Sequence, residues 1–140
     1  MLDSLFVTPA ITAIDEALKS ASADGALAVV GNAKLAQALA KRGEVLAVGL
    51  TPRAAKKIPG ALADLSTIDP GSLAGVVGVD ATDESVRAWV RVVKDGGAVI
   101  LVDRNHGPEA SRRALCAGLT EIEQRRVGRV VITSGLVTQL

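Results

Sequence analysis

The stretch Ala26–Pro52, "ALAVVGNAKLAQALAKRGEVLAVGLTP", decides the fold that we predict for this chain. It holds a short apolar run, a turn at Gly31, an amphipathic segment and a second apolar run. Short apolar runs bounded by turn residues are typical of strands buried on both faces of a parallel sheet. The helical spacing of Leu35, Ala38 and Leu39 predicts a helix between these strands. The stretch is therefore predicted to form a βαβ unit.

The same alternation continues on both sides of this unit. Thr8 as N-cap and Pro9 at the first helical position predict the start of a first helix. Two alternating segments at the end of the chain, joined across Gly128, predict an antiparallel pair. The predicted helices cover 8–20, 32–42, 51–57, 82–93 and 108–116, and the predicted strands cover 26–30, 44–50, 61–65, 73–81, 98–103, 119–127 and 129–137.

This order of elements predicts an α/β fold. Alternating strands and helices form right-handed crossovers and a parallel sheet with helices on both faces. We expect a single domain over residues 1–140: a three-layer αβα sandwich whose mostly parallel sheet has an antiparallel C-terminal strand. Ligands of such sheets bind beyond the carboxyl ends of the strands, where the strand order reverses. Pocket residues are thus expected near five positions: Gly31, Gly49, Asp64, Asp80 and Asp103.

Composition argues against several partners. Sixteen Lys and Arg balance fifteen Asp and Glu, so the charge favours neither nucleic acid nor a membrane surface. The only aromatic residues, Phe6 and Trp89, offer no set of base-stacking platforms. No apolar run approaches the length of a membrane span, and the N-terminus lacks the basic region of a secretory signal. We expect a cytoplasmic protein with neither nucleic acid nor membrane as partner.

The apolar fraction points to self-association or to a protein partner. At 49%, it exceeds what one core of this size readily hides. Trp89, Arg125 and Arg126 are the interface candidates, although Trp89 on an amphipathic helix is also typical of a core residue. Basic residues crowd the C-terminal quarter while the N-terminal part is acidic, which predicts a molecular dipole that favours head-to-tail association. A solvated surface of mixed charge is the alternative.

Two later stretches carry a family resemblance. "PGSLAGVVGVD" (70–80) resembles the turn and fourth strand of the class I S-adenosylmethionine-dependent methyltransferases, and "VRAWVRVVKDGGAVILVD" (86–103) resembles their next helix, turn and fifth strand. The predicted antiparallel strand at the end is also a hallmark of that family. The resemblance covers nearly the whole chain from the first helix onward. It implies S-adenosylmethionine as the cofactor, if the protein is active.

The chain departs from the family where the cofactor is held. The family's first loop has three glycines, whereas "AVVGNAKLA" (28–36) keeps Gly31 alone, followed by Asn32. The family ends its second strand in a carboxylate that accepts the ribose hydroxyls, whereas "VGLTP" (48–52) has Gly49 there. Two lost hydrogen bonds to a charged acceptor, at roughly 1.5–3 kcal/mol each, weaken binding by about two to four orders of magnitude. Arg53 adds a positive charge near a cationic sulfonium.

Other candidate site residues have two interpretations each. In the family an aspartate reaches the adenine amino group, which Asp64 could match, and Asp80 ends the fourth strand, where family substrates are held. Both also suit turns and helix caps. His106 is the only histidine and stands in a polar loop without a predicted acidic partner. One His and one Cys do not make a metal site, and Cys116 at helical spacing predicts a buried thiol.

Three functions follow from this pattern. The leading hypothesis is a catalytically inactive methyltransferase-like domain, without cofactor or catalytic residues, that serves as a protein-interaction or assembly module and associates with itself. The first alternative is a minimal active methyltransferase that holds S-adenosylmethionine through backbone groups and Asp64. The second alternative is a sensor that binds another nucleotide or small molecule in the same crevice. The cofactor-binding candidates, if a ligand binds, are Gly31, Asn32, Gly49, Asp64 and Asp80.

Overall fold

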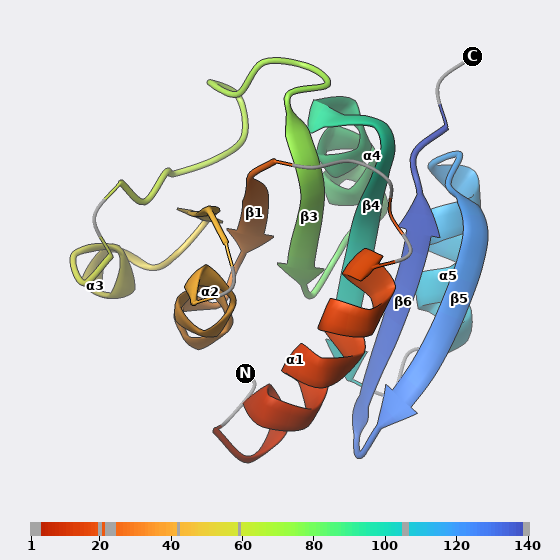
Figure 1. Cartoon of the computed structure of the whole chain (residues 1–140), viewed down its shortest axis with the longest axis horizontal. Coiled ribbons are helices and arrows are strands. Elements are labelled where there is room, and N and C mark those ends of the chain that lie inside the picture. Colours follow the sequence, from red (N-terminus) through yellow and green to blue (C-terminus); the bar gives the residue numbers. More distant parts are fainter. Residues whose placement is uncertain are drawn as a thin grey trace.

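The computed structural model describes residues 4–19, 21, 25–41, 43–58, 60–104 and 107–138. Helices and strands alternate along the chain up to the final pair of strands (Figure 1). In chain order they are α1 (Ser4–Lys19), β1 (Leu27–Val30), α2 (Ala33–Ala40), β2 (Val45–Val48), α3 (Pro52–Ala55), β3 (Leu73–Val79), α4 (Asp83–Val92), β4 (Val93–Arg104), α5 (Gly107–Cys116), β5 (Thr120–Val127) and β6 (Val130–Leu136).

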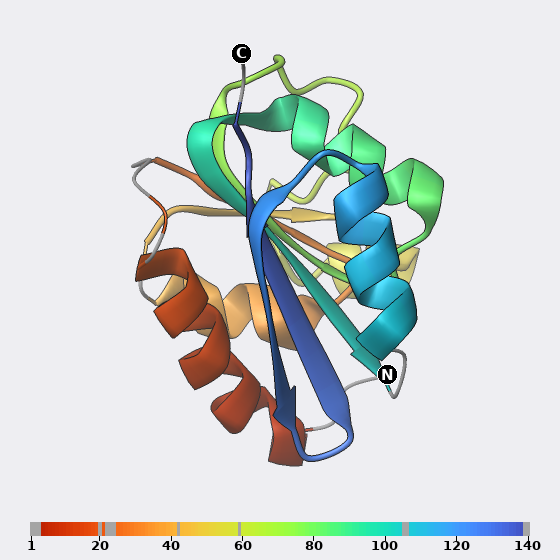
Figure 2. The ribbon, with the colours of Figure 1, turned by 90° about the vertical axis from the view of Figure 1, so that its right-hand side faces the viewer.

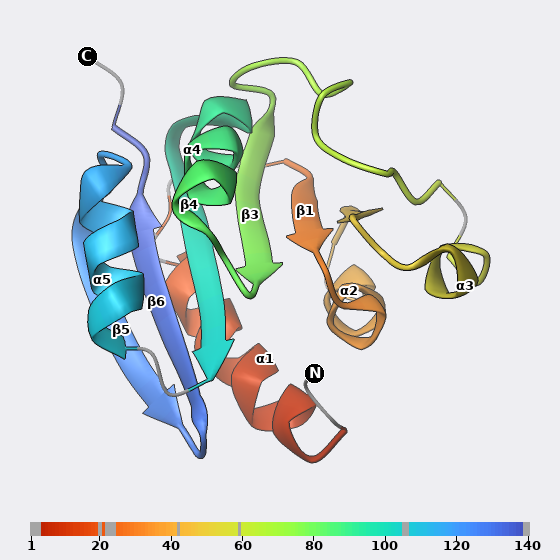
Figure 3. The ribbon, with the colours of Figure 1, turned by 180° about the vertical axis from the view of Figure 1, so that it is seen from behind.

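One six-stranded sheet in the order β2-β1-β3-β4-β6-β5 forms the middle layer. The first four strands of this order run parallel, and β6 pairs antiparallel with both β4 and β5. Helices α1 and α2 cover one face, and α4 and α5 cover the other (Figures 2 and 3). The predicted α/β sandwich with an antiparallel C-terminal strand is therefore confirmed. The strand order reverses at β1, since β2 and β3 lie on opposite sides of it.

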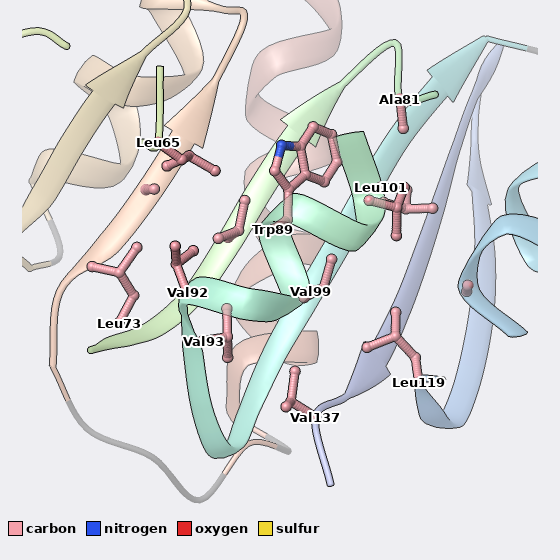
Figure 4. Close-up of a cluster of buried hydrophobic side chains, with 14 of the residues drawn as sticks. Leu65, Leu73, Ala81, Trp89, Val92, Val93, Val99, Leu101, Leu119 and Val137 are labelled. Atoms are coloured by element: carbon pink, nitrogen blue, oxygen red, sulfur yellow. The ribbon is translucent and has the colours of Figure 1, made fainter. Parts of the chain in front are cut away.

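Each face of the sheet has its own hydrophobic cluster. Under α1 and α2, the inward side chains of the helices meet those of the central strands, with Ile14, Leu35 and Ile100 fully buried. Under α4 and α5, Trp89 lies at the centre of the second cluster (Figure 4). Strand β3, an almost uninterrupted buried run, contributes Val77 to the first cluster and Val76 to the second. This explains why its sequence shows no alternation.

The first helix begins earlier than predicted. It starts at Ser4, so Thr8 is not its N-cap and Pro9 lies inside it rather than at its first position. Proline inside a helix removes one backbone hydrogen bond. The helix still forms because the residues that follow bury an apolar face on the sheet, including Ala10 and Ile14, which are both 0% exposed.

Two strand predictions are also wrong. Residues 61–65 form no strand: Leu62 makes an isolated parallel bridge to Val48, and the polar residues that follow turn the chain away. In the other case, the expected turn at residues 94–97 belongs to β4, which begins at Val93. Extra residues bulge out of the β3–β4 register there, and Gly96 donates its backbone N–H to the carbonyl oxygen of Val137 at 2.8 Å.

Most apolar side chains of the described residues belong to the two hydrophobic clusters or pack against them. Leu115, at 67% exposure, is the only large hydrophobic residue found exposed in the described part of the chain. Trp89 is 3% exposed, so it is a core residue and not a surface anchor, which corrects its place among the interface candidates. Composition alone misjudged the surface because a sheet covered on both faces buries many Val and Ala side chains. None of the described helices is long and apolar enough to cross a membrane.

The fold brings together one acid and one arginine from the two ends of the predicted dipole. Helix α1 packs beside β5 and β6 (Figure 2). The carboxylate of Glu16 on α1 forms an ion pair with the guanidinium of Arg125 on β5. Charges that are far apart in the sequence thus neutralise each other locally. The head-to-tail association expected from separated charges stays a prediction.

Candidate functional site

A crevice opens where sequence analysis expected one, between the loops that follow β1 and β2. We call it the β1–β2 crevice; its volume is about 260 Å³. Gly31, Asn32 and Gly49, three of the predicted site residues, lie together in its wall. The other lining residues are Ala33, Lys34, Leu50, Thr51 and Ala54. Its position beyond the carboxyl ends of parallel strands is that of a ligand site in α/β sheets.

The two glycines shape the crevice with their backbones. Gly31 has φ +85° and Gly49 has φ +67°, conformations that favour glycine. The N–H of Gly31 donates to the carbonyl oxygen of Val48 at 2.9 Å, which ties the first loop to the end of β2. The N–H of Gly49 donates to the carbonyl oxygen of Leu62 at 3.0 Å. Both amides are therefore used inside the fold and do not face a ligand as free donors.

Asn32 serves as the N-cap of α2. Its backbone is extended, with φ −149°, and its side-chain oxygen accepts the backbone N–H of Leu35 at 2.9 Å. The residue is 8% exposed. This cap satisfies one of the four amides that a helix start leaves without an intrahelical acceptor. Thr51 caps α3 in the same way through Ala54, at the start of the helix predicted over 51–57.

The crevice carries positive rather than negative charge. Lys34 is the only charged residue among those that line it, and none of its lining residues is a carboxylate. Because Lys34 is exposed, its charge favours an anionic over a cationic group in the crevice only modestly. At position 49, where the family resemblance implies a ribose-binding acid, glycine has only a hydrogen atom as its side chain. A Cβ there would lie 3.5 Å from Cγ1 of Val30.

The predicted carboxylates lie outside the crevice. Asp64 is exposed and closes a turn, because its carboxylate accepts the backbone N–H of Ser66 at 2.8 Å and also the Ser66 hydroxyl. The hydroxyl bond and then the backbone bond hold the pKa of Asp64 below its ordinary value. Asp80 is exposed at the end of β3, with φ +55°. Neither residue lines the β1–β2 crevice.

Asp103 and His106 complete the predicted residues at this edge of the sheet. Asp103 lies near the end of β4, is 5% exposed and pairs in register with Val131 of β6. It is not among the residues that line the crevice. His106 lies outside the described residues. Cys116 is exposed, contrary to the prediction, because the buried face of α5 is made by Gly107, Ala110 and Ala114.

An ion-pair network that sequence analysis missed joins α4 to α5. Arg112 donates to Asp83 at 3.1 Å and to Glu109 at 3.0 Å, and Arg113 lies 3.3 Å from Asp83. Hydrogen bonds from Arg112 are the main cause that lowers the pKa of both carboxyl groups, and the two acids raise the pKa of Arg112. The helical spacing of Glu109, Arg112 and Arg113 is a sequence signal for part of it.

Gln124 is a second residue that only the structure identifies. Its side-chain nitrogen lies 2.7 Å from the carbonyl oxygen of Gly107, 2.9 Å from the hydroxyl of Thr133 and 3.0 Å from that of Ser111. Thr133 is 0% exposed. Gln124 thus fixes the start of α5 against the β5–β6 pair. In the described part of the chain, no three potential ligands among His, Cys, Asp and Glu come together as a metal site would require.

Comparisons of the sequence and of the structure with known proteins give different results. No protein-family model matches the chain, and no curated protein matches its sequence. Solved structures do match. The Thermus thermophilus 16S rRNA N2 G1207 methyltransferase RsmC, solved with AdoMet and guanosine, has a TM-score of 0.64 at 22% identity. That match covers 89% of this chain and 38% of RsmC, so this chain spans well under half of the RsmC length.

Two further matches cover most of both chains. A ribosomal protein L11 methylase from Lactobacillus delbrueckii subsp. bulgaricus has a TM-score of 0.72 at 18% identity, over 99% of this chain and 81% of its own. A putative S-adenosyl-L-methionine-dependent methyltransferase from Methanococcus maripaludis has a TM-score of 0.68 at 13% identity, over 98% and 89%. At these identities the similarity is one of fold. The chain has the Rossmann-like fold of the class I methyltransferases.

Proposed function

We propose that this chain is a single methyltransferase-like domain that has lost S-adenosylmethionine-dependent methyl transfer and acts in the cytoplasm as a self-associating interaction or assembly module. The observation that carries the proposal is Gly49. It stands at the end of β2, where the resemblance implies a ribose-binding carboxylate, and it lines the β1–β2 crevice. Asp64 and Asp80, which could have replaced that carboxylate, do not line the crevice.

The residues of the crevice do not fit S-adenosylmethionine. The cofactor carries a sulfonium cation, and the one charged residue in the crevice wall is Lys34. Lys34 is exposed, so solvent screens its repulsion of the sulfonium, but the crevice wall offers no opposite charge to attract it. The volume of about 260 Å³ also falls below the roughly 300–1,000 Å³ usual for ligand pockets. Since the amides of Gly31 and Gly49 are already bonded, the backbone offers little compensation.

Calorimetric titration tests the loss of cofactor binding. Purified protein is titrated with S-adenosylmethionine and, separately, with S-adenosylhomocysteine, which lacks the sulfonium charge. We expect no binding of S-adenosylmethionine with a dissociation constant below about 1 mM. Micromolar binding of either compound at 1:1 stoichiometry contradicts the proposal and favours the active-enzyme alternative. Copurified adenosyl ligand in the fresh protein would do the same.

One observation favours a second candidate function. The crevice is open, and it retains the position at which α/β sheets bind ligands. A small neutral or anionic molecule that meets Lys34 fits it better than a cation does. Thermal-shift screening of nucleotides and small carboxylates tests this sensor function, because a ligand that binds only the folded state raises Tm. The matched control is Lys34→Gln, which should abolish the shift from an anion that binds there.

A further inference from the structure

The two edges of the sheet differ in how they are covered. At the β2 edge, Leu62 donates its N–H to the carbonyl oxygen of Ala47 at 2.8 Å and accepts from Gly49, so a neighbouring segment closes this edge. At the other edge stands β5, which pairs with β6 on one side only. Figure 2 looks onto this edge and shows the β5–β6 hairpin between α1 and α5. Outside β5, no described residue adds a strand.

Strand β5 has an ordered distribution of charge. Its sequence is "TEIEQRRV", with two acids before Gln124 and two arginines after it. Glu123 and Arg125 are opposite Ser134 and Ile132 of β6 and point to the α1 side of the sheet. Both side chains are exposed. Exposed charge on an edge strand normally discourages pairing with other chains. Here the order of the charges makes one pairing an exception.

That exception is an antiparallel pairing of β5 with itself. A two-fold axis perpendicular to the sheet keeps each face of the sheet on the same side in both copies. Since directly opposite side chains share a face, one residue of β5 must then lie opposite its own copy, and the axis runs midway between the two. With the axis at Gln124, Glu123 of each copy lies opposite Arg125 of the other. An axis at residue 123, 125 or 126 instead sets that charged residue opposite its own copy, which is unfavourable, and residues 121 and 122 lie in the irregular part of the strand before its regular pairing begins at Glu123. The charge pattern therefore selects a single register.

We propose that β5 is the self-association surface of this protein, and that two copies pair antiparallel across a two-fold axis at Gln124 to form one continuous sheet. This inference rests on the self-association in the proposed function and names the surface that performs it. Two Glu123–Arg125 pairs, one on each side of the axis, fix the register. Arg125 keeps its own Glu16 and gains Glu123 of the second copy.

The α1 face of the sheet leaves the charged side chains of β5 accessible. Two adjoining grooves of about 480 and 400 Å³ lie between α1 and the β5–β6 pair and share Ala17, Glu123 and Ser134, so helix α1 does not cover Glu123. Glu123 makes no ion pair with any described residue, so its carboxylate is available to Arg125 of the second copy. Edge pairing buries a small area, and such contacts are weak. We expect a dissociation constant in the micromolar range, on the order of 10–100 µM.

Charge exchange across the axis tests the proposal. Sedimentation velocity at about 5–500 µM should show a monomer–dimer equilibrium for the wild type. Glu123→Arg sets arginines opposite each other at both pairs and should weaken dimerisation about tenfold or more. The double variant Glu123→Arg/Arg125→Glu restores opposite charges in the same register. Because Arg125→Glu also sets a glutamate beside Glu16, it is made in a Glu16→Gln background, where it should return the dissociation constant to within about threefold of that of Glu16→Gln alone. Glu44→Arg, the same charge change before β2, should have no effect.

Three other outcomes would each contradict a specific part of these proposals. A wild type that stays monomeric at about 500 µM overturns both the edge pairing and the proposed self-association. A dimer that Glu123→Arg leaves unchanged overturns the edge pairing alone, because the copies then meet elsewhere. A double variant as monomeric as Glu123→Arg, with an unchanged Tm, overturns the register at Gln124. The loss of cofactor binding is tested separately by calorimetry and is not touched by these results.

Discussion

The indole of Trp89 lies directly against the backbone of Gly78. A Cβ at position 78 would stand 2.1 Å from Cη2 of the ring and 2.5 Å from Cζ3. Gly78 is on β3 and Trp89 is on α4, so this contact sets how closely the helix approaches the sheet. The only tryptophan of the chain is therefore accommodated because the strand beneath it has no side chain there.

We expect Gly78→Ala to destabilise the fold by about 1–3 kcal/mol or more, because a methyl group overlaps the ring and α4 must move outward. Urea unfolding followed by tryptophan fluorescence measures this. Gly43→Ala is the matched control, since a Cβ at that position meets no atom within 4 Å. Equal stability of the two variants would contradict the packing described for Gly78.

Asn32 is expected to matter for stability through its helix cap. Asn32→Ala should lower the free energy of unfolding by about 0.5–2 kcal/mol, because the backbone N–H of Leu35 loses its acceptor near the buried start of α2. Asn32→Ser and Asn32→Asp retain a capping oxygen and should lose much less. If all three variants unfold at the same urea concentration as the wild type, the cap does not contribute to stability.

Gly49→Asp returns a carboxylate to the end of β2. Aspartate tolerates the positive φ of this position better than most residues, and so does asparagine, which makes Gly49→Asn the control for strain and size. If a carboxylate at this position strengthens cofactor binding, as the proposed function requires, the aspartate variant should bind S-adenosylmethionine at least about tenfold more tightly than the asparagine variant in calorimetry. Equal affinities would show that the crevice is unsuitable for another reason.

Stability should depend on acidification through the Arg112 network. In the folded protein Arg112 holds the pKa of Asp83 and of Glu109 below their ordinary values of 3.8 and 4.5. Groups with a lowered folded-state pKa stabilise the fold above these ordinary values, and the stabilisation is lost as the pH falls through the folded-state values. The wild type should therefore lose stability more steeply below about pH 4.5 than Arg112→Gln does.

Urea midpoints of the two proteins between about pH 6 and pH 3 check this expectation. Asp83, Glu109 and Arg112 are exposed at the surface, so high salt should reduce the difference between the two curves. Parallel curves at low salt would mean that the network contributes nothing measurable to stability. Asp64, whose pKa Ser66 lowers, contributes equally to both proteins and cancels in the comparison.

The sequence by itself determined the architecture. Apolar runs such as Val76–Val79 and the helical spacing of the segments between them specify strands, helices and their order, because burial follows directly from local pattern. The same holds for the final hairpin at Gly128 and for the helix starts at Thr51 and Thr82, which open the predicted helices 51–57 and 82–93. The position of the crevice near Gly31 and Gly49 follows from topology alone.

Only the tertiary structure decided which side chains meet. Residues 61–65 have the composition of a strand but make a single bridge, because pairing depends on the neighbouring segment and not on propensity. Glu16 and Arg125 are 109 residues apart in the chain, and no local pattern announces their ion pair. Trp89 is buried because Gly78 leaves it space from another element, and β5 is an open edge because the sheet ends there.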